Sequence, residues 1–139
     1  MIGLSLIKTK GVIIKALDYK ENDKLIWAYT EELGKITFIA RGSKKSKSKY
    51  LAITLPLCFG DYVFFKGKNL YNLQEGKIIN SFQGLLNNLD KITYSSYVCE
   101  LIDICIQDGE VNKMLFREFL TCLYLLNTDA MEYELLVRA

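Results

Sequence analysis

A run of cations is the most chemically specific feature of the chain. Residues 41–49 hold five positive charges and no negative one, spaced by glycine and serine. Mobile cations of this kind suit phosphate oxygens, because each contact with a nucleic-acid backbone releases a bound counterion. The alternative is a solvated loop whose charge only keeps the protein soluble. We predict nucleic-acid contact through Lys35 and the cations of the run, which are Arg41, Lys44, Lys45, Lys47 and Lys49.

Aromatic residues interleave with these cations and offer a second way to hold a nucleic acid. Exposed rings stack on bases, and each stacked base contributes roughly 1–3 kcal/mol. In a strand, however, alternate side chains point into the core, so about half of the rings must be structural. We predict Tyr29 and Tyr50 as the exposed rings. The full set is Trp27, Tyr29, Phe38, Tyr50, Tyr62, Phe64 and Phe65.

Residue types for catalysis or metal binding are scarce. The absence of histidine removes histidine-dependent nucleophilic catalysis and histidine metal sites. The four cysteines are never spaced C-x-x-C and lie in apolar stretches, so we interpret them as free thiols in a reducing compartment. Adjacent carboxylates such as Glu31 and Glu32 face opposite ways in a strand, which favours solvated surface. We therefore predict a binding protein with no catalytic residue, metal or cofactor.

The distribution of charge divides the chain into a basic half and an acidic half, and the two halves differ in their predicted secondary structure. Residues 1–80 hold fourteen basic and seven acidic side chains, whereas residues 81–139 hold four basic and nine acidic ones. This asymmetry indicates a polyanion-binding module joined to a second unit. We place the boundary between residues 1–82, the nucleic-acid-binding domain, and residues 83–139, a helical domain.

The basic half has the pattern of a small β-barrel. Runs of β-branched and aromatic residues alternate with turn clusters. Five or six short strands in about eighty residues, with almost no helix, favour an OB-fold barrel, and an SH3-like barrel is the rival. The predicted strands cover residues 8–19, 25–30, 36–40, 51–57, 62–65 and 70–82.

The acidic half has the apolar period of helices. One helix is predicted from Leu89 to Ile106, ended by Asp108-Gly109, and a second over residues 114–126. Asp129 with Glu132 resembles a capping pair that opens a third helix, whose apolar residues would still need a partner. The fold class is therefore a β-barrel plus an all-α part. We favour an incomplete helical domain and a chain that is a fragment of something longer.

Membrane and secretion signals are missing from the sequence. No run of about eighteen uncharged apolar residues occurs, which argues against a membrane span. Lys8 and Lys10 interrupt the apolar start before a secretory signal could form. We expect a soluble, cytoplasmic protein.

Short motifs in order along the chain resemble the N-terminal part of the bacterial RecO family of recombination mediators. They begin with Lys10-Gly11-Val12-Ile13, Tyr19-x-Glu21-x-Asp23-x-Leu25, Thr30 to Gly34-Lys35-Ile36, and Ala40-Arg41-Gly42 before the Lys/Ser run. They continue with Leu55-Pro56, Leu70, Leu73-x-Glu75, Ser81-Phe82, and Tyr97 to Glu100-Leu101. Each motif is weak alone, and their order and spacing carry the resemblance.

The resemblance implies an OB-fold followed by a helical domain, and a function without enzymatic turnover. That function is to bind single- and double-stranded DNA, anneal strands, and help load recombinase onto strands coated with single-strand-binding protein. It implies DNA, RecR and single-strand-binding protein as partners, and a nucleoid-associated cytoplasmic location. The four-cysteine zinc module of many members would lie after this chain, so zinc is not carried over.

Two other functions fit the same residues. One is a protein-interaction adaptor whose barrel docks RecR, with an incidental basic loop. The other is an RNA-binding OB module. The adaptor would bind DNA with little dependence on salt, whereas a DNA-binding domain requires a steep dependence. A nuclease would need clustered acidic residues on the barrel, and the seven acids of residues 1–80 are scattered.

Overall fold

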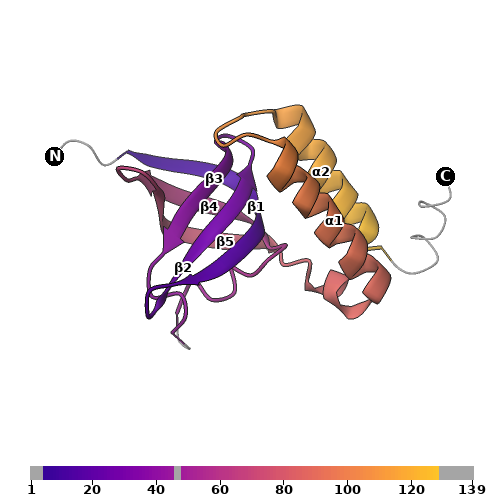
Figure 1. Ribbon diagram of the computed structural model, residues 1–139, viewed down its shortest axis with the longest axis horizontal. Coiled ribbons are helices and arrows are strands. Elements are labelled where there is room, and N and C mark those ends of the chain that lie inside the picture. The colour runs from indigo at the N-terminus through magenta and orange to yellow at the C-terminus, as the bar shows by residue number, and fades with distance from the viewer. Residues whose placement is uncertain (1–4, 46–47, 129–139) are drawn as a thin grey trace.

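Five strands come first in the structure and two α-helices follow (Figure 1). The structure is a computed structural model that describes residues 5–45 and 48–128. The strands are β1 (Leu6–Tyr19), β2 (Asp23–Thr30), β3 (Gly34–Ala40), β4 (Phe59–Lys66) and β5 (Tyr71–Asn80). The helices are the 3-10 helix η1 (Gln83–Asn87), α1 (Leu89–Cys105) and α2 (Lys113–Leu126).

The strands close into a barrel in the order β1-β2-β3-β5-β4, with β4 pairing back onto β1. All pairs are antiparallel except β3 with β5, whose parallel ladder joins only Phe38 with Tyr71 and Ile39 with Asn72. This is the order of an OB-fold, so the predicted fold class is confirmed. The β3–β5 seam is the shortest ladder of the barrel.

Alternation along the strands separates the barrel interior from its outer surface. In β2, Ile26 and Ala28 point inward, so Leu25, Trp27 and Tyr29 point outward. The register of β1 shifts between Ile13 and Lys15, which places a bulge at Ile14. The buried interior consists of Ile13, Ile26, Ala28, Ile36, Phe38, Ala40, Ile53, Cys58, Tyr62, Phe64 and Leu73.

The segment between β3 and β4 is a series of turns, so the strand predicted over residues 51–57 is wrong. The φ angle of Leu57 is 75°, a left-handed conformation that cannot continue a strand, and it follows Pro56, which has no N–H to donate. Ile53 is nevertheless buried, and its carbonyl accepts a 2.7 Å hydrogen bond from the hydroxyl of Tyr62. The apolar run therefore covers the barrel interior as turns rather than as a strand, and at its end the Leu57 N–H donates to the carbonyl of Ile13 in β1 at 2.7 Å.

Both predicted helices exist, and asparagine caps begin them. The Asn88 side chain accepts hydrogen bonds from the backbone N–H groups of Asp90 and Lys91, and Asn112 accepts one from Leu115. The connection after α1 uses a positive φ at Gly109, where the sequence predicts the break. The predicted third helix falls at residues 129–139, outside the described residues.

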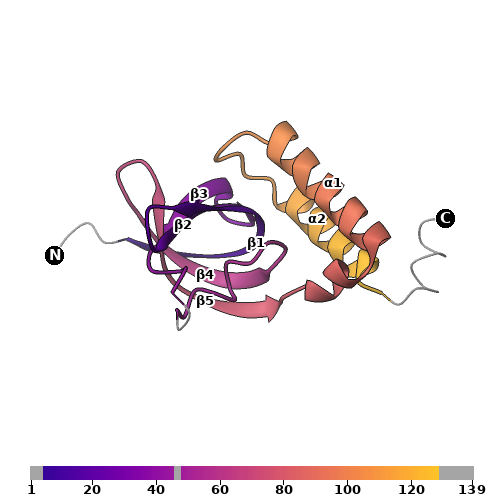
Figure 2. The ribbon, with the colours of Figure 1, turned by 60° about the horizontal axis from the view of Figure 1, so that its bottom comes forward.

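The helices pack on one outer side of the barrel and share a core with it (Figures 1 and 2). The Tyr29 ring of β2 lies 5.7 Å from the Phe116 ring and 5.9 Å from the Phe119 ring of α2, between ring centroids. Phe59 of β4 also contacts Phe116, at 6.4 Å. This packing buries one part of the outer surface of the barrel, at Val12 of β1, Tyr29 of β2 and Phe59 of β4.

Candidate nucleic-acid interface

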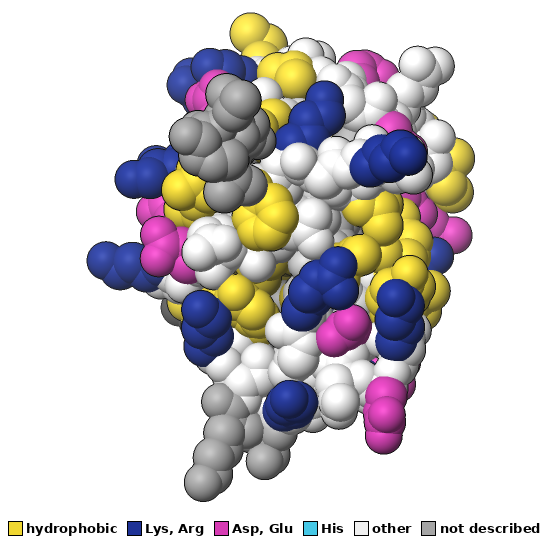
Figure 3. Space-filling model, turned by 90° about the vertical axis from the view of Figure 1, so that its left-hand side faces the viewer, with side chains coloured by type: hydrophobic (Ala, Val, Ile, Leu, Met, Phe, Trp, Pro, Cys, Tyr) yellow, Lys and Arg dark blue, Asp and Glu magenta, His cyan; other side chains and the backbone are white. Residues whose placement is uncertain are grey.

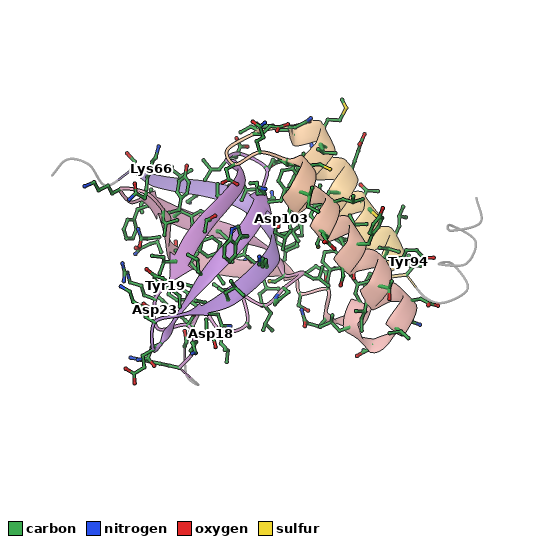
Figure 4. The ribbon with its side chains drawn as sticks, in the orientation of Figure 1. Asp18, Tyr19, Asp23, Lys66, Tyr94 and Asp103 are labelled. Carbon is green, nitrogen blue, oxygen red and sulfur yellow. The ribbon has the colours of Figure 1, made fainter. Side chains whose placement is uncertain are left out.

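The basic segment begins against the hairpin that joins β1 to β2. The backbone N–H of Gly42 donates to the Asp23 carboxylate at 2.8 Å, and that of Lys44 donates to the carbonyl of Asn22 at 3.1 Å. Figure 4 shows Asp18, Tyr19 and Asp23 at the end of the barrel remote from the helices. The start of the segment, with Arg41 and Lys44, therefore lies at that end.

The cations of this segment are only weakly engaged by the protein. Lys44 Nζ lies 3.3 Å from Asp18 Oδ2, and Arg41 Nη1 lies 4.0 Å from Asp23 Oδ2. Such surface pairs contribute about 0–1 kcal/mol, so a phosphate can replace the carboxylate at little cost. Lys45 is exposed and forms no ion pair with the described residues. Lys47 lies outside the described residues.

Tyr50 is half-buried and anchors the segment to the barrel. Its hydroxyl donates to the carbonyl oxygens of Leu73 and Gln74 of β5, at 3.2 and 2.8 Å. Lys49 Nζ lies 5.1 Å from the centre of the Tyr50 ring. Because these contacts are with β5, Tyr50 joins the basic segment to the sheet, and its role in base stacking stays a prediction.

The sequence predicts Tyr29 as an exposed ring, and the structure contradicts this. The side chain is completely buried between the barrel and α2. Burial raises the pKa of its phenol, and the nearby Glu110 carboxylate raises that pKa further. The Tyr29 ring therefore cannot stack on a base in this structure. Strand alternation is enough to point Tyr29 outward, but its cover by the helices depends on tertiary packing.

Lys35 is likewise buried, at 7% exposure, and does not face solvent as a phosphate contact requires. Its ammonium group donates to the backbone carbonyl of Asp103 at 2.5 Å. Asp103 Oδ1 and Asp108 Oδ1 lie 3.6 and 3.7 Å from the same nitrogen. The predicted role of Lys35 is thus corrected: this cation joins β3 to the end of α1 and the loop after it.

The uncovered part of the outer face carries an aromatic residue that the sequence prediction did not select. Trp27 is partly exposed at the centre of β2, where its strand partners are Lys15 of β1 and Thr37 of β3. The ammonium of Lys15 lies 4.9 Å from the centre of the Trp27 ring. Leu17, half exposed, lies two residues beyond Lys15 on β1. The alternation of residues along the strand could have identified Trp27 as an outward-facing ring.

Further cations surround the remote end of the barrel. Lys20 of the β1–β2 hairpin lies over the Tyr19 ring at 5.3 Å, and Lys66 and Lys68 flank the β4–β5 hairpin. Figure 3 shows this end, with Lys and Arg side chains spread over it among hydrophobic and fewer acidic ones. A hollow of about 370 Å³ on the seam between β3 and β5 is lined partly by Thr37 and Lys66, and also by Lys35 and Asp108. The arrangement suits an extended anionic chain.

Within residues 5–45 and 48–128, no three His, Cys, Asp or Glu side chains lie close enough to hold a metal ion. Among the same residues, no helix is both long and apolar enough to cross a membrane.

Cys99, on α1, is buried, and this burial with the neighbouring Cys122 thiol raises its pKa to about 12. Cys105 is the exposed free thiol.

A closed barrel of this strand order, with a helical pair on its side, defines an OB-fold protein with an appended helical part. Residues 1–82 match the family described as recombination protein O, N terminal. Residues 86–139 match recombination protein O, C terminal. The chain therefore belongs to the recombination protein O family, and the resemblance seen in its motifs is confirmed.

Curated relatives carry the name DNA repair protein RecO. The chain is 64% identical over 136 residues to the protein of Clostridium perfringens, covering 98% of this chain and 55% of the relative. Identity is 52% to the protein of Clostridium acetobutylicum, with the same coverage. It is 32% to that of Alkaliphilus metalliredigens, over 96% of this chain and 54% of the relative. The chain thus spans about half the length of the curated relatives it matches.

Proposed function

We propose that this chain is the DNA-binding part of a DNA repair protein that acts as a recombination mediator without enzymatic turnover. It binds single- and double-stranded DNA, anneals complementary strands, and helps load recombinase onto strands coated with single-strand-binding protein. RecR and single-strand-binding protein are its protein partners, at the nucleoid in the cytoplasm. Residues 1–82 form the nucleic-acid-binding domain and residues 83–139 the helical domain. Membership of the recombination protein O family supports this proposal.

The observation that carries DNA binding is the cationic end of the barrel. The described cations of the basic segment, Arg41, Lys44, Lys45 and Lys49, are exposed or lightly paired. Arg41 and Lys44 lie beside the β1–β2 hairpin, at the end opposite the helices, and Lys49 lies over the Tyr50 ring. Contacts with phosphates there give affinity with little sequence preference, because no base edge is read.

The test replaces Lys44, Lys45, Lys47 and Lys49 together by Ala and measures affinity for unrelated oligonucleotides by fluorescence anisotropy. We expect weaker binding and a salt slope that shrinks by about one unit for each phosphate that the variant no longer neutralises. The melting temperature should hardly move, because exposed substitutions usually change stability by about 0.5 kcal/mol or less each. A strong preference for one sequence would contradict the proposal.

A matched pair of double variants separates a local effect from a change in net charge. Lys44→Ala with Lys45→Ala removes two charges at the remote end, and Lys113→Ala with Arg117→Ala removes two from α2. The α2 side chains pair with Glu32 and Glu31, at 3.2 and 3.8 Å. Only the first double variant should weaken DNA binding. Unchanged affinity and salt slope in all variants would instead favour the adaptor that docks RecR.

A further inference from the structure

Trp27 is the only tryptophan of the chain, and it lies where three strands of the barrel meet solvent. Tyr29, two residues further along β2 and on the same outer face, is completely covered by α2. Trp27 is only partly covered, and the ammonium group of the exposed Lys15 lies over its ring. The helices therefore stop short of one aromatic ring that has a cation above it.

We propose that Trp27 is a stacking platform for one base of single-stranded nucleic acid, and that Lys15 then moves from the ring to the adjacent phosphate. This inference rests on the proposed function and names the form of substrate that the same barrel prefers. Bases in a duplex are already stacked and paired, so only an unpaired base can lie on the ring. Single strands should therefore bind more tightly than duplex of the same length.

The balance of interactions favours exchange of Lys15 for a base. A cation over an exposed ring gains roughly a factor of 2 to 5 in equilibrium constant. A stacked base gains roughly a factor of 5 to 160. The ammonium group released from the ring also gains a phosphate contact, which in turn releases a counterion. Lys15 thus covers the Trp27 ring in the free protein and contacts a phosphate in the complex.

The surroundings of Trp27 restrict the path of a bound strand. On one side, Thr37 leads from Trp27 to the seam hollow of about 370 Å³, whose charged lining residues are Lys35, Lys66 and Asp108. On the other side, Lys15 borders a groove of about 340 Å³ against α1, whose lining includes Glu100 and Asp103. The groove against α1 has two carboxylates in its lining, whereas the seam hollow has one, Asp108, which is paired with Lys35. Because carboxylates repel phosphates, the strand runs from Trp27 toward Lys66, across β2 and β3.

The single tryptophan makes the test specific to this position. Titrating the full chain with a thymidine oligonucleotide should quench its tryptophan emission, in parallel with anisotropy of the labelled oligonucleotide. Trp27→Ala should weaken binding at least about fivefold, and Trp27→Phe should recover part of the loss. Tyr97→Ala, which removes an exposed ring of α1, is the matched control and should leave affinity unchanged. Lys15→Ala should lower the salt slope by about one.

Failure of the inference and failure of the proposed function give different results. If the oligonucleotide binds by anisotropy but tryptophan emission is unchanged and Trp27→Ala binds like the parent, the platform is disproved and DNA binding stands. Equal affinity for single strand and duplex would also overturn it. If no oligonucleotide binds at low salt, the proposed function fails and the platform fails with it. The melting temperature of each variant shows whether it is still folded under the conditions of the binding assay.

Discussion

Lys35 carries the same charge as the lysines of the basic segment, but its contacts give it a structural role. Its ammonium group lies between β3 and the end of α1, close to Asp103 and Asp108. We predict that Lys35→Ala lowers the free energy of unfolding by about 1.5–3 kcal/mol, the range for hydrogen bonds to charged groups. Affinity for DNA should be unchanged at a temperature where the variant is folded.

Urea unfolding measures the first effect and anisotropy the second. Lys45→Ala is the matched control, because it removes the same charge from an exposed position. That control should change stability by about 0.5 kcal/mol or less and should weaken DNA binding. A Lys35→Ala variant that is fully stable but binds DNA poorly would show that the sequence-based assignment was correct after all.

The buried thiol of Cys99 makes the stability of the folded protein depend on alkaline pH. Burial raises the pKa of its thiol from 9.0 to about 12, and the Cys122 thiol adds to the shift. The neutral thiol is favoured in the folded state, so its contribution is fully present below pH 9 and is lost as pH rises toward 12. Tyr62 acts in the same direction, because burial raises its phenol pKa above 10.0.

Replacing Cys99 by Ala should therefore flatten the alkaline loss of stability. Between pH 8 and 10 the variant should lose about 1.4 kcal/mol less of its unfolding free energy than the parent. Urea unfolding at both pH values measures this difference, and any packing cost of the substitution cancels within each protein. Parallel curves for parent and variant would mean that Cys99 ionises freely in the folded state.

At the scale of elements, the loop between β2 and β3 meets the loop between α1 and α2. Gly34 has a φ of +71°, and a Cβ atom there would lie 2.2 Å from the carbonyl oxygen of Glu110. Gly109 has a similar φ of +78° but open space around it. A substitution at Gly109 therefore tests backbone strain alone, whereas one at Gly34 tests backbone strain together with a steric clash between the two loops.

We predict that Gly109→Ala costs about 1–2 kcal/mol, the cost of a left-handed conformation. Gly34→Ala should cost about 1–3 kcal/mol more, because the backbone of Glu110 must move away from the new methyl group. Thermal or urea unfolding of both variants measures the difference. Equal losses would mean that the two loops separate at no cost and that the barrel and helices are less tightly joined than this contact indicates.

At the scale of the whole molecule, barrel and helices share one core and should unfold together. Trp27 fluorescence reports the barrel, and far-ultraviolet circular dichroism reports mainly α1 and α2. We predict the same midpoint from both probes. Tyr29→Ala should lower both midpoints together and cost about 3–5 kcal/mol, as expected for loss of a buried ring.

Tyr97→Ala is the control for this prediction, because its ring is exposed on α1. It should change stability by about 0.5 kcal/mol or less. Two separate transitions in the parent would contradict a shared core. A Tyr29→Ala variant in which only the helical signal falls would show that the barrel is stable without its contact to α2.

Strand and helix periods in the sequence were sufficient to determine the class of fold. Alternation placed β1, β2, β3 and β4 close to their observed bounds, and the change of period near Leu89 placed α1. Local patterns succeed here because a strand or a helix buries one face whatever its partner is. The prediction of a strand over residues 51–57 was wrong for the same reason: Ile53 and Leu57 are buried, but they lie in turns.

The basic segment was also evident in the sequence, since charge and small spacers need no tertiary context. The roles of the outward residues of β2 and β3 did need it. The cross-strand pairs Tyr29–Lys35 and Trp27–Thr37 lie on the same outer face of the sheet. Strand alternation alone therefore predicts the same exposure for both pairs. Only the docking of α1 and α2 decided which pair is buried and which meets solvent, because cover of a sheet face depends on contacts between residues far apart in the chain.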